Sequence, residues 1–259
     1  MMKTIWLTAV GSSKDLVKGL IGRLQPYGLE IKGHLWEDDL AGLAWSKPRE
    51  ELLKSEVSLW LIMTSSEDLA LSSIRYGLSL LVTMVQAHKG LSFPIGILLT
   101  GGDTVKSEDL PTPLKGADFL AQDDPALGAK LVAKVHSPAS NVVSDYRLDV
   151  YASSRIGQWL EVGPQHKPWH GAMLGVAGAE ITAHAVGPKG SLPDKSVLNY
   201  PIRGMKATIG EREYTAWAVQ NELDPHTSYF VKVEGTPESI MFGPYSPEDE
   251  AEVYVIKLT

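Results

Sequence analysis

The sequence predicts two domains: an α/β domain with a five-stranded, flavodoxin-like parallel sheet over residues 1–137, and an all-β sandwich over residues 146–259. Residues 1–137 alternate short apolar runs with helical patterns, whereas the rest shows strand patterns with almost no helical periodicity. Residues 138–145 carry Pro, Ser, Asn and Asp, so we expect them to form the linker.

Five short apolar stretches are expected to form the parallel sheet. Three of them, TIWLTAV, VSLWLIMT and FPIGILL, are almost continuously apolar. Strands have this composition when helices cover both faces of a parallel sheet. The expected strands are residues 4–10, 29–35, 57–64, 93–99 and 117–121.

Capping residues mark the expected helices between these strands. Ser12 or Ser13 precedes KDLVKGLIGRL, Ser65 or Ser66 precedes one long helix that ends near residue 89, and Asp124 precedes the last helix. Open α/β sheets bind ligands beyond the carboxyl ends of their strands. We therefore expect a ligand near residues 11–13, 36–39 and 65–68.

The second domain is expected to be an antiparallel sandwich, with the immunoglobulin fold as one candidate. Its strand patterns are separated by Gly, Pro, Asn and Asp clusters, and alternation is clearest at Thr215, Trp217 and Val219. The expected strands are residues 146–152, 157–162, 179–186, 204–209, 214–220, 228–235 and 251–258.

Composition excludes several function classes. The net charge of −7 is spread along the chain without a basic block, so neither nucleic acid nor an anionic membrane is an expected partner. The absence of cysteine removes disulfides and thiolate chemistry. Pro168 between His166 and His170 argues against a helical zinc pair, so no metal site is expected. No apolar run has the length of a secretory signal region or a membrane span, so we expect a cytoplasmic protein of bacterial type.

Known catalytic motifs are also missing from the expected ligand edge. A phosphoacceptor receiver would need carboxylates after the first and third strands, where the chain has Gly11-Ser12 and Ser65-Ser66. The first strand is followed by neither a P-loop nor G-x-G-x-x-G, and G-x-S-x-G is absent. ATPases, dinucleotide reductases and α/β-hydrolases are therefore disfavoured.

Several residues at this edge are candidates for ligand binding. Asp38 and Asp39 follow the second strand and could orient a ribose or act as acid and base, although a solvated loop fits equally well. Trp36 and Trp45 flank this loop and could stack on a base or simply pack in the core. The full set of candidate ligand-binding residues is Gly11, Ser12, Ser13, Trp36, Asp39, Trp45 and Ser65.

Several segments, taken in order, resemble the Toll/interleukin-1 receptor (TIR) domain family. WLTAVGSSKD is similar to its first strand and box, and LEIKGHLWEDDLAGLAWSKPREELLKSEVSLWLIMTSS to its second and third strands with the loop between them. FPIGILLTGGDTVKSEDLPTPLKGADFLA resembles its fourth and fifth strands. The resemblance covers residues 3–137 and does not extend to the second domain.

The TIR resemblance implies two activities, self-association in signalling and cleavage of NAD at its nicotinamide glycosidic bond. Cleavage depends on a glutamate in a pattern like small-x-Trp-Cys-x-x-Glu-Leu, whose carboxylate stabilises developing positive charge. In this chain Ser73 and Ile74 replace Trp-Cys, and Gly77 takes the place of the glutamate. Close packing of the helix explains Gly77 as well as loss of a catalytic acid does.

We therefore predict a TIR-like signalling or defence-related interaction module without NAD hydrolase activity, fused to a β-sandwich recognition domain. Its expected partners are copies of itself or another TIR domain, and no cofactor is expected, although NAD or a related nucleotide is a candidate ligand. The alternative is a divergent enzyme that cleaves NAD or a nucleoside at its N-glycosidic bond. Such an enzyme would have to use Asp38, Asp39, Glu67 or Asp68.

Overall fold

The computed structural model describes residues 3–101, 104–138, 142–246 and 252–259. The chain divides into two units, the first made of Met1–Leu110 and Leu114–Val142 and the second of Pro111–Pro113 and Val143–Thr259. The expected linker, residues 138–145, includes 139–141, which lie outside the described residues. Each unit is built around a hydrophobic cluster of its own.

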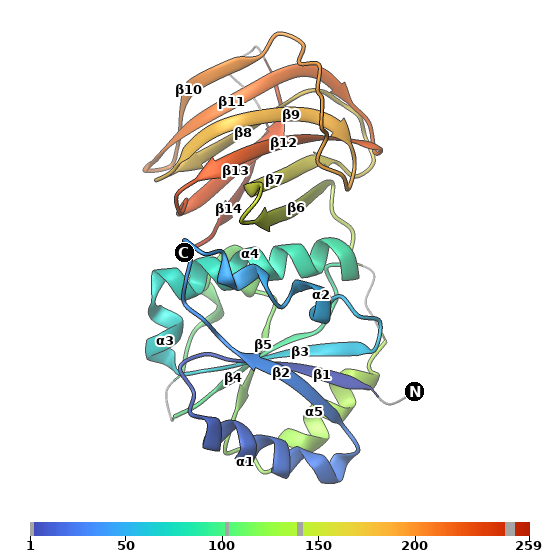
Figure 1. The fold of residues 1–259 in the computed structure, drawn as a ribbon, viewed down its shortest axis with the longest axis vertical. Helices are drawn as coiled ribbons and strands as arrows, with labels where there is room; N and C mark the ends of the chain where they lie inside the picture. The colour runs from blue at the N-terminus through green and yellow to red at the C-terminus, as the bar shows by residue number, and fades with distance from the viewer. Residues whose placement is uncertain (1–2, 102–103, 139–141, 247–251) are drawn as a thin grey trace. The chain divides into compact units, whose positions relative to one another are not determined.

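The first unit contains a five-stranded parallel sheet in the order β2-β1-β3-β4-β5 (Figure 1). This is the predicted flavodoxin-like arrangement, and each expected strand is present with a boundary shift of at most two residues. The strands are β1 (Thr4–Ala9), β2 (Glu30–Leu35), β3 (Val57–Thr64), β4 (Ile95–Leu99) and β5 (Asp118–Ala121).

Helices cover both faces of this sheet (Figure 1). One face carries α1 (Lys14–Leu24) and α5 (Leu127–His136), and the other carries α2 (Arg49–Leu52), α3 (Ser66–Ala70) and α4 (Ser72–Lys89). Short 3-10 turns lie at Gln25–Tyr27, Ala44–Ser46, Ser107–Asp109 and Thr112–Leu114. None of the helices within the described ranges has the length and apolar character needed to cross a membrane.

The prediction of one long helix from Ser65 or Ser66 is wrong at one point. Leu71 has extended backbone angles, φ −69° and ψ 127°, and divides the segment into α3 and α4. Ser65 caps α3 by accepting a hydrogen bond from the Asp68 amide, as expected of a serine before a helix. Because of this break, α3 and α4 run in different directions, although their residues share one helical pattern in the sequence (Figure 1).

Alternating residues of the strands supply the two halves of the core in the first unit. Ile5, Leu7 and Leu61 belong to the cluster that packs against α1 and α5. The residues that alternate with them point to the opposite face of the sheet. There the Trp60 indole donates a hydrogen bond to Thr8 Oγ1 over 2.9 Å. Buried polar groups of this kind are tolerated because each finds a partner.

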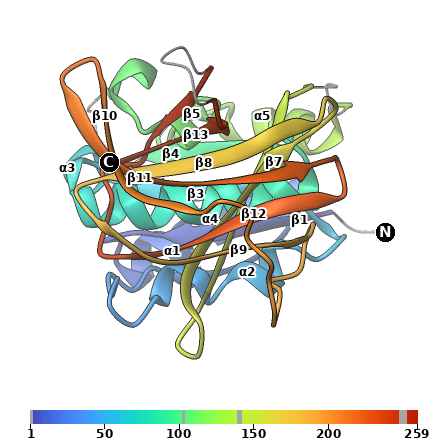
Figure 2. The same cartoon turned by 90° about the horizontal axis from the view of Figure 1, so that it is seen from above.

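The second unit is a sandwich of two antiparallel sheets, ordered β6-β7-β12-β9 and β10-β11-β8-β13-β14 (Figures 1 and 2). The order β6-β7-β12-β9 matches the ABED sheet of an immunoglobulin constant-type domain. The order β8-β13-β14 matches its CFG sheet. The hairpin β10–β11 extends the second sheet beside β8. Seven of the strands are β6 (Tyr146–Ser153), β7 (Gly157–Pro164), β9 (Glu180–Pro188), β10 (Ile202–Ile209), β11 (Arg212–Leu223), β12 (Thr227–Glu234) and β14 (Tyr254–Lys257).

Two strands of the sandwich were not predicted, β8 (Trp169–Ala177) and β13 (Ser239–Pro244). Nearly every residue of both strands is buried, so the polar alternation that marks other strands of the sandwich is absent. The interpretation of QHKPWHG as a loop is therefore wrong at its end, because Trp169 and His170 begin β8. Pairing with β11 and β13 on its two sides makes β8 the centre of its sheet.

Candidate functional site

The loops that follow β1 and β3 meet at the carboxyl edge of the parallel sheet. Gly11 has a φ of 61°, and a Cβ at this position would run into the carboxylate of Asp68. Since β1 and β3 are neighbours, this is the point where the strand order reverses. Doubly wound sheets bind ligands at such a point.

Hydrogen bonds hold the serines of this edge in place. Ser65 Oγ donates to Asp68 Oδ2 over 2.7 Å and accepts from the Asp68 amide over 3.0 Å. Ser12 Oγ donates to the Val10 carbonyl over 3.2 Å, and Ser13 Oγ caps α1 by accepting from the Leu16 amide. The structure thus brings Gly11, Ser12, Ser65 and Asp68 together, while Ser13 serves a helix end.

The carboxylates that follow β2 each have a local partner. Asp39 accepts from the Gly42 amide over 2.8 Å, and Asp38 accepts from the Ser73 hydroxyl at the start of α4 over 2.8 Å. Glu37 forms a 2.6 Å ion pair with Lys47. These contacts shape the loop and tie it to α4, as expected when short polar side chains organise a turn.

Trp36 lies against Gly77 in the middle of α4. A Cβ added to Gly77 would come within 2.7 Å of Trp36 Cζ2 and 3.1 Å of Trp45 Cβ. Trp45 is only 1% exposed, so its ring is not available to stack on a ligand in this structure. The indole nitrogens of both tryptophans are buried without a hydrogen-bond partner in the described part of the chain. The close-packing explanation of Gly77 is therefore supported directly.

This packing limits which carboxylates are available at the carboxyl edge of the sheet. The sequence of α4 contains no aspartate or glutamate, and Trp36 occupies the space in front of Gly77. Glu67 is exposed on α3, whereas the partly buried Asp68 faces Gly11. Asp68 is therefore the candidate acid that the fold places at the switch point. Its contact with Gly11 leaves no periodic signal in the sequence, because it joins α3 to the loop after β1.

No sequence motif points to the partly buried histidine of the edge strand β2. His34 on β2 accepts a hydrogen bond at Nδ1 from the Trp6 indole over 3.2 Å. Burial lowers the pKa of His34 to about 4, because the charged ring would lose its hydration. The histidine is therefore neutral at pH 7 and belongs to the packing of β1 and β2.

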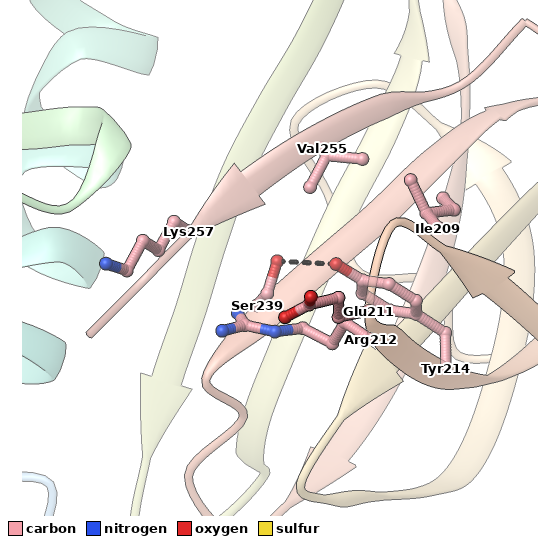
Figure 3. Close-up of a pocket in the computed structure, with 7 residues that line it drawn as sticks. All are labelled: Ile209, Glu211, Arg212, Tyr214, Ser239, Val255 and Lys257. Carbon is pink, nitrogen blue, oxygen red and sulfur yellow. Dashed lines mark hydrogen bonds between the residues drawn. The ribbon is translucent and has the colours of Figure 1, made fainter.

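The second unit carries a groove of about 530 Å³ on the β11, β13 and β14 sheet (Figure 3). At its floor Ser239 Oγ donates to the Ile256 carbonyl over 3.0 Å, so the Tyr214 hydroxyl, 2.9 Å away, donates to Ser239. The lining residues are Ile209, Glu211, Arg212, Tyr214, Ser239, Val255 and Lys257. Charges of both signs lie at the rim, so the groove does not select one sign of ligand charge.

A second buried histidine, His184, lies between the two sheets of the sandwich. Its Nδ1 is 2.9 Å from the Tyr229 hydroxyl, and its ring meets Trp217 edge-on at 4.8 Å. Burial, aided by the charge of Arg203, lowers the pKa of His184 to about 4. Arg203 also stacks over Trp217 at 4.8 Å. This cluster joins β9, β11 and β12 and has the character of a core contact.

Comparison with known proteins finds similarity only at the level of the fold. No protein-family model matches the chain. No curated protein matches it either. A pilus assembly-related protein from Burkholderia pseudomallei K96243 is 16% identical, with a TM-score of 0.36 over 54% of this chain and 95% of that one.

Two further solved structures resemble part of the chain. A response regulator protein from Burkholderia multivorans is 24% identical, with a TM-score of 0.30 over 54% of this chain and 100% of that one. The chemotaxis protein CheY4 from Vibrio cholerae is 18% identical, with a TM-score of 0.33 over 52% and 99%. The similarity is weak, concerns the flavodoxin-like fold alone, and does not extend to function.

Proposed function

We propose that the first unit is a TIR-like signalling or defence-related interaction module without NAD hydrolase activity, and that the sandwich is a recognition domain. The observation that carries the proposal is the packing of Trp36 on Gly77. A glutamate at position 77 would have to displace this indole, and α4 supplies no other acid. In this chain α4, the helix that corresponds to the one with the catalytic glutamate in TIR domains, packs against Trp36 through Gly77.

The local use of the nearby carboxylates supports the same proposal. Asp38 and Asp39 each accept a hydrogen bond within the loop or from α4. A general acid or an electrostatic stabiliser must instead face the reacting atoms. The order of the sequence segments that resemble TIR domains then favours assembly with copies of the chain or with another TIR domain.

Sedimentation velocity of the full chain, alone and mixed with a second TIR-domain protein, tests this function. We expect the average mass to rise above the 28.2 kDa of one chain as the concentration increases or the second protein is added. A chain that stays monomeric in both series and also cleaves NAD would overturn the proposal.

A second candidate function is N-glycosidic cleavage of NAD or a nucleoside. One observation favours it, namely that Asp68 lies beside Gly11 and Ser65 at the switch point of the sheet. The variant Asp68→Asn keeps the shape of the side chain and removes its charge. If the chain releases nicotinamide from NAD and this variant does not, N-glycosidic cleavage is the correct function.

A further inference from the structure

The outer edge of β2 is open. β2 pairs with β1 alone, and no described strand lies on its other side. The Glu30 amide donates to the Lys3 carbonyl over 3.3 Å, and the Trp36 amide donates to the Ala9 carbonyl over 2.8 Å. Because backbone groups alternate along a strand, the N–H and C=O groups of the odd-numbered residues 31, 33 and 35 point away from the sheet. They form a template for one more strand.

An apolar groove of about 260 Å³ runs between this edge and α1. Its lining includes Ile31 and Leu35 from β2 and Val17 and Ile21 from α1. Leu35 is 46% exposed and Ile21 is 38% exposed, so the groove is not filled by the unit's own side chains. Gly33 presents no side chain between Ile31 and Leu35, and a Cβ there would run into the Leu7 carbonyl oxygen.

The charged residues that line the groove are all lysines, namely Lys14, Lys18 and Lys32. No carboxylate is among the lining residues. Lys32 is paired with Glu30 over 3.2 Å. Lys14 and Lys18 lie one turn apart on α1, and neither forms an ion pair with another residue of the described ranges. A chain of net charge −7 thus carries a local positive rim around an apolar groove.

We propose that this groove binds an extended segment of a protein partner that combines apolar and acidic side chains and adds a strand beside β2. The segment's backbone would pair with residues 31, 33 and 35, its apolar side chains would enter the groove, and its carboxylates would meet Lys14 and Lys18. This inference deepens the proposed interaction function, because it rests on the first unit being an interaction module and names the surface and the partner's chemistry.

Fluorescence polarisation with the full chain tests this inference. The probe is a labelled octapeptide with a Leu-Val-Leu-Val core flanked by two glutamates at each end, and its control carries lysines in place of the glutamates. We expect the glutamate peptide alone to bind, more weakly as salt is raised because the lysines are exposed. Exchanging both α1 lysines (Lys14→Glu with Lys18→Glu) should weaken binding about tenfold or more.

Two further variants separate the parts of the site. Lys115→Glu reverses an exposed lysine far from β2 in the sequence and should leave binding unchanged. Leu35→Pro removes an outward N–H while the Trp36 bond to Ala9 remains, and it should weaken binding by removing one strand-to-strand hydrogen bond. If Leu35→Pro fails to fold by circular dichroism, the lysine variants still decide the question.

Three results would overturn the inference. The first is equal binding of both peptides or of the double lysine variant. The second is binding of laurate but not of the glutamate peptide, which would make the groove a site for a small acid. The third is dimerisation that depends on Lys14 and Lys18, which would make a second copy the occupant. A chain that assembles with a TIR domain but ignores the peptide would keep the proposed function and lose only this surface.

Discussion

The indole of Trp36 takes up the space that a side chain at position 77 would need. Trp36 Cζ2 would be 2.7 Å from a Cβ on Gly77, a distance that real side chains do not adopt. The loop after β2 is thereby fixed to the middle of α4, with Asp38 bonded to Ser73 at the start of the helix. This contact explains why a glycine stands at position 77.

The coupling between these two residues can be measured. Gly77→Ala should destabilise the chain by about 1–2 kcal/mol, because overpacking outweighs the better helix propensity of alanine. In a Trp36→Ala background the clash with the indole is gone, so the same change should cost less or stabilise by up to about 1 kcal/mol. Urea unfolding of the four proteins gives the coupling. Equal effects of Gly77→Ala in both backgrounds would contradict the packing account.

Gly11 and Asp68 should be coupled as well. Gly11→Ala places a Cβ against the Asp68 carboxylate and forces a left-handed φ of 61° on alanine. Asp68→Ala should relieve the collision but leave the backbone penalty of about 1–2 kcal/mol. Thermal unfolding of the single and double variants tests this. Gly19→Ala on α1 is the matched control: its Cβ meets nothing within 4 Å, so it should be neutral or stabilising.

Acid should destabilise the first unit through His34. Its pKa is lowered to about 4 in the folded chain from about 6.5 when unfolded, so the unfolded state binds the proton first. The stabilisation is complete above pH 6.5 and is lost as the pH falls towards 4, with a slope of up to about 1.4 kcal/mol per pH unit.

Urea midpoints at pH 7 and pH 5 check the role of His34. His34→Gln should reduce the difference between the two midpoints, whereas His136→Gln, at an exposed site on α5, should not. Some dependence on pH will remain, because burial also lowers the pKa of His184 to about 4. A midpoint difference that is the same in His34→Gln and the wild type would exclude His34 as a source.

The five parallel strands were predicted from their short apolar runs, and the helices and most of the sandwich from the periods that helices and half-buried strands leave in the sequence. β8 and β13 were missed because nearly all of their residues are buried and show no polar alternation like that of the other strands in the sandwich. The break at Leu71 was missed because α3 and α4 share one helical pattern.

The candidate site was predicted less completely than the fold. The position of the expected ligand edge follows from the parallel sheet, and Gly11 and Ser65 each lie against Asp68 there. Trp36 and Gly77 belong to separate elements, and the sequence left close packing and catalytic loss equally open. The contact between them supports close packing.

Nicotinamide release from NAD by the purified 259-residue chain tests the central claim most directly. Because α4 carries no acid and Trp36 fills the space before Gly77, we expect release no faster than in buffer without protein. Sustained release that Asp68→Asn abolishes would contradict the account and make the carboxylate beside Gly11 a catalytic group.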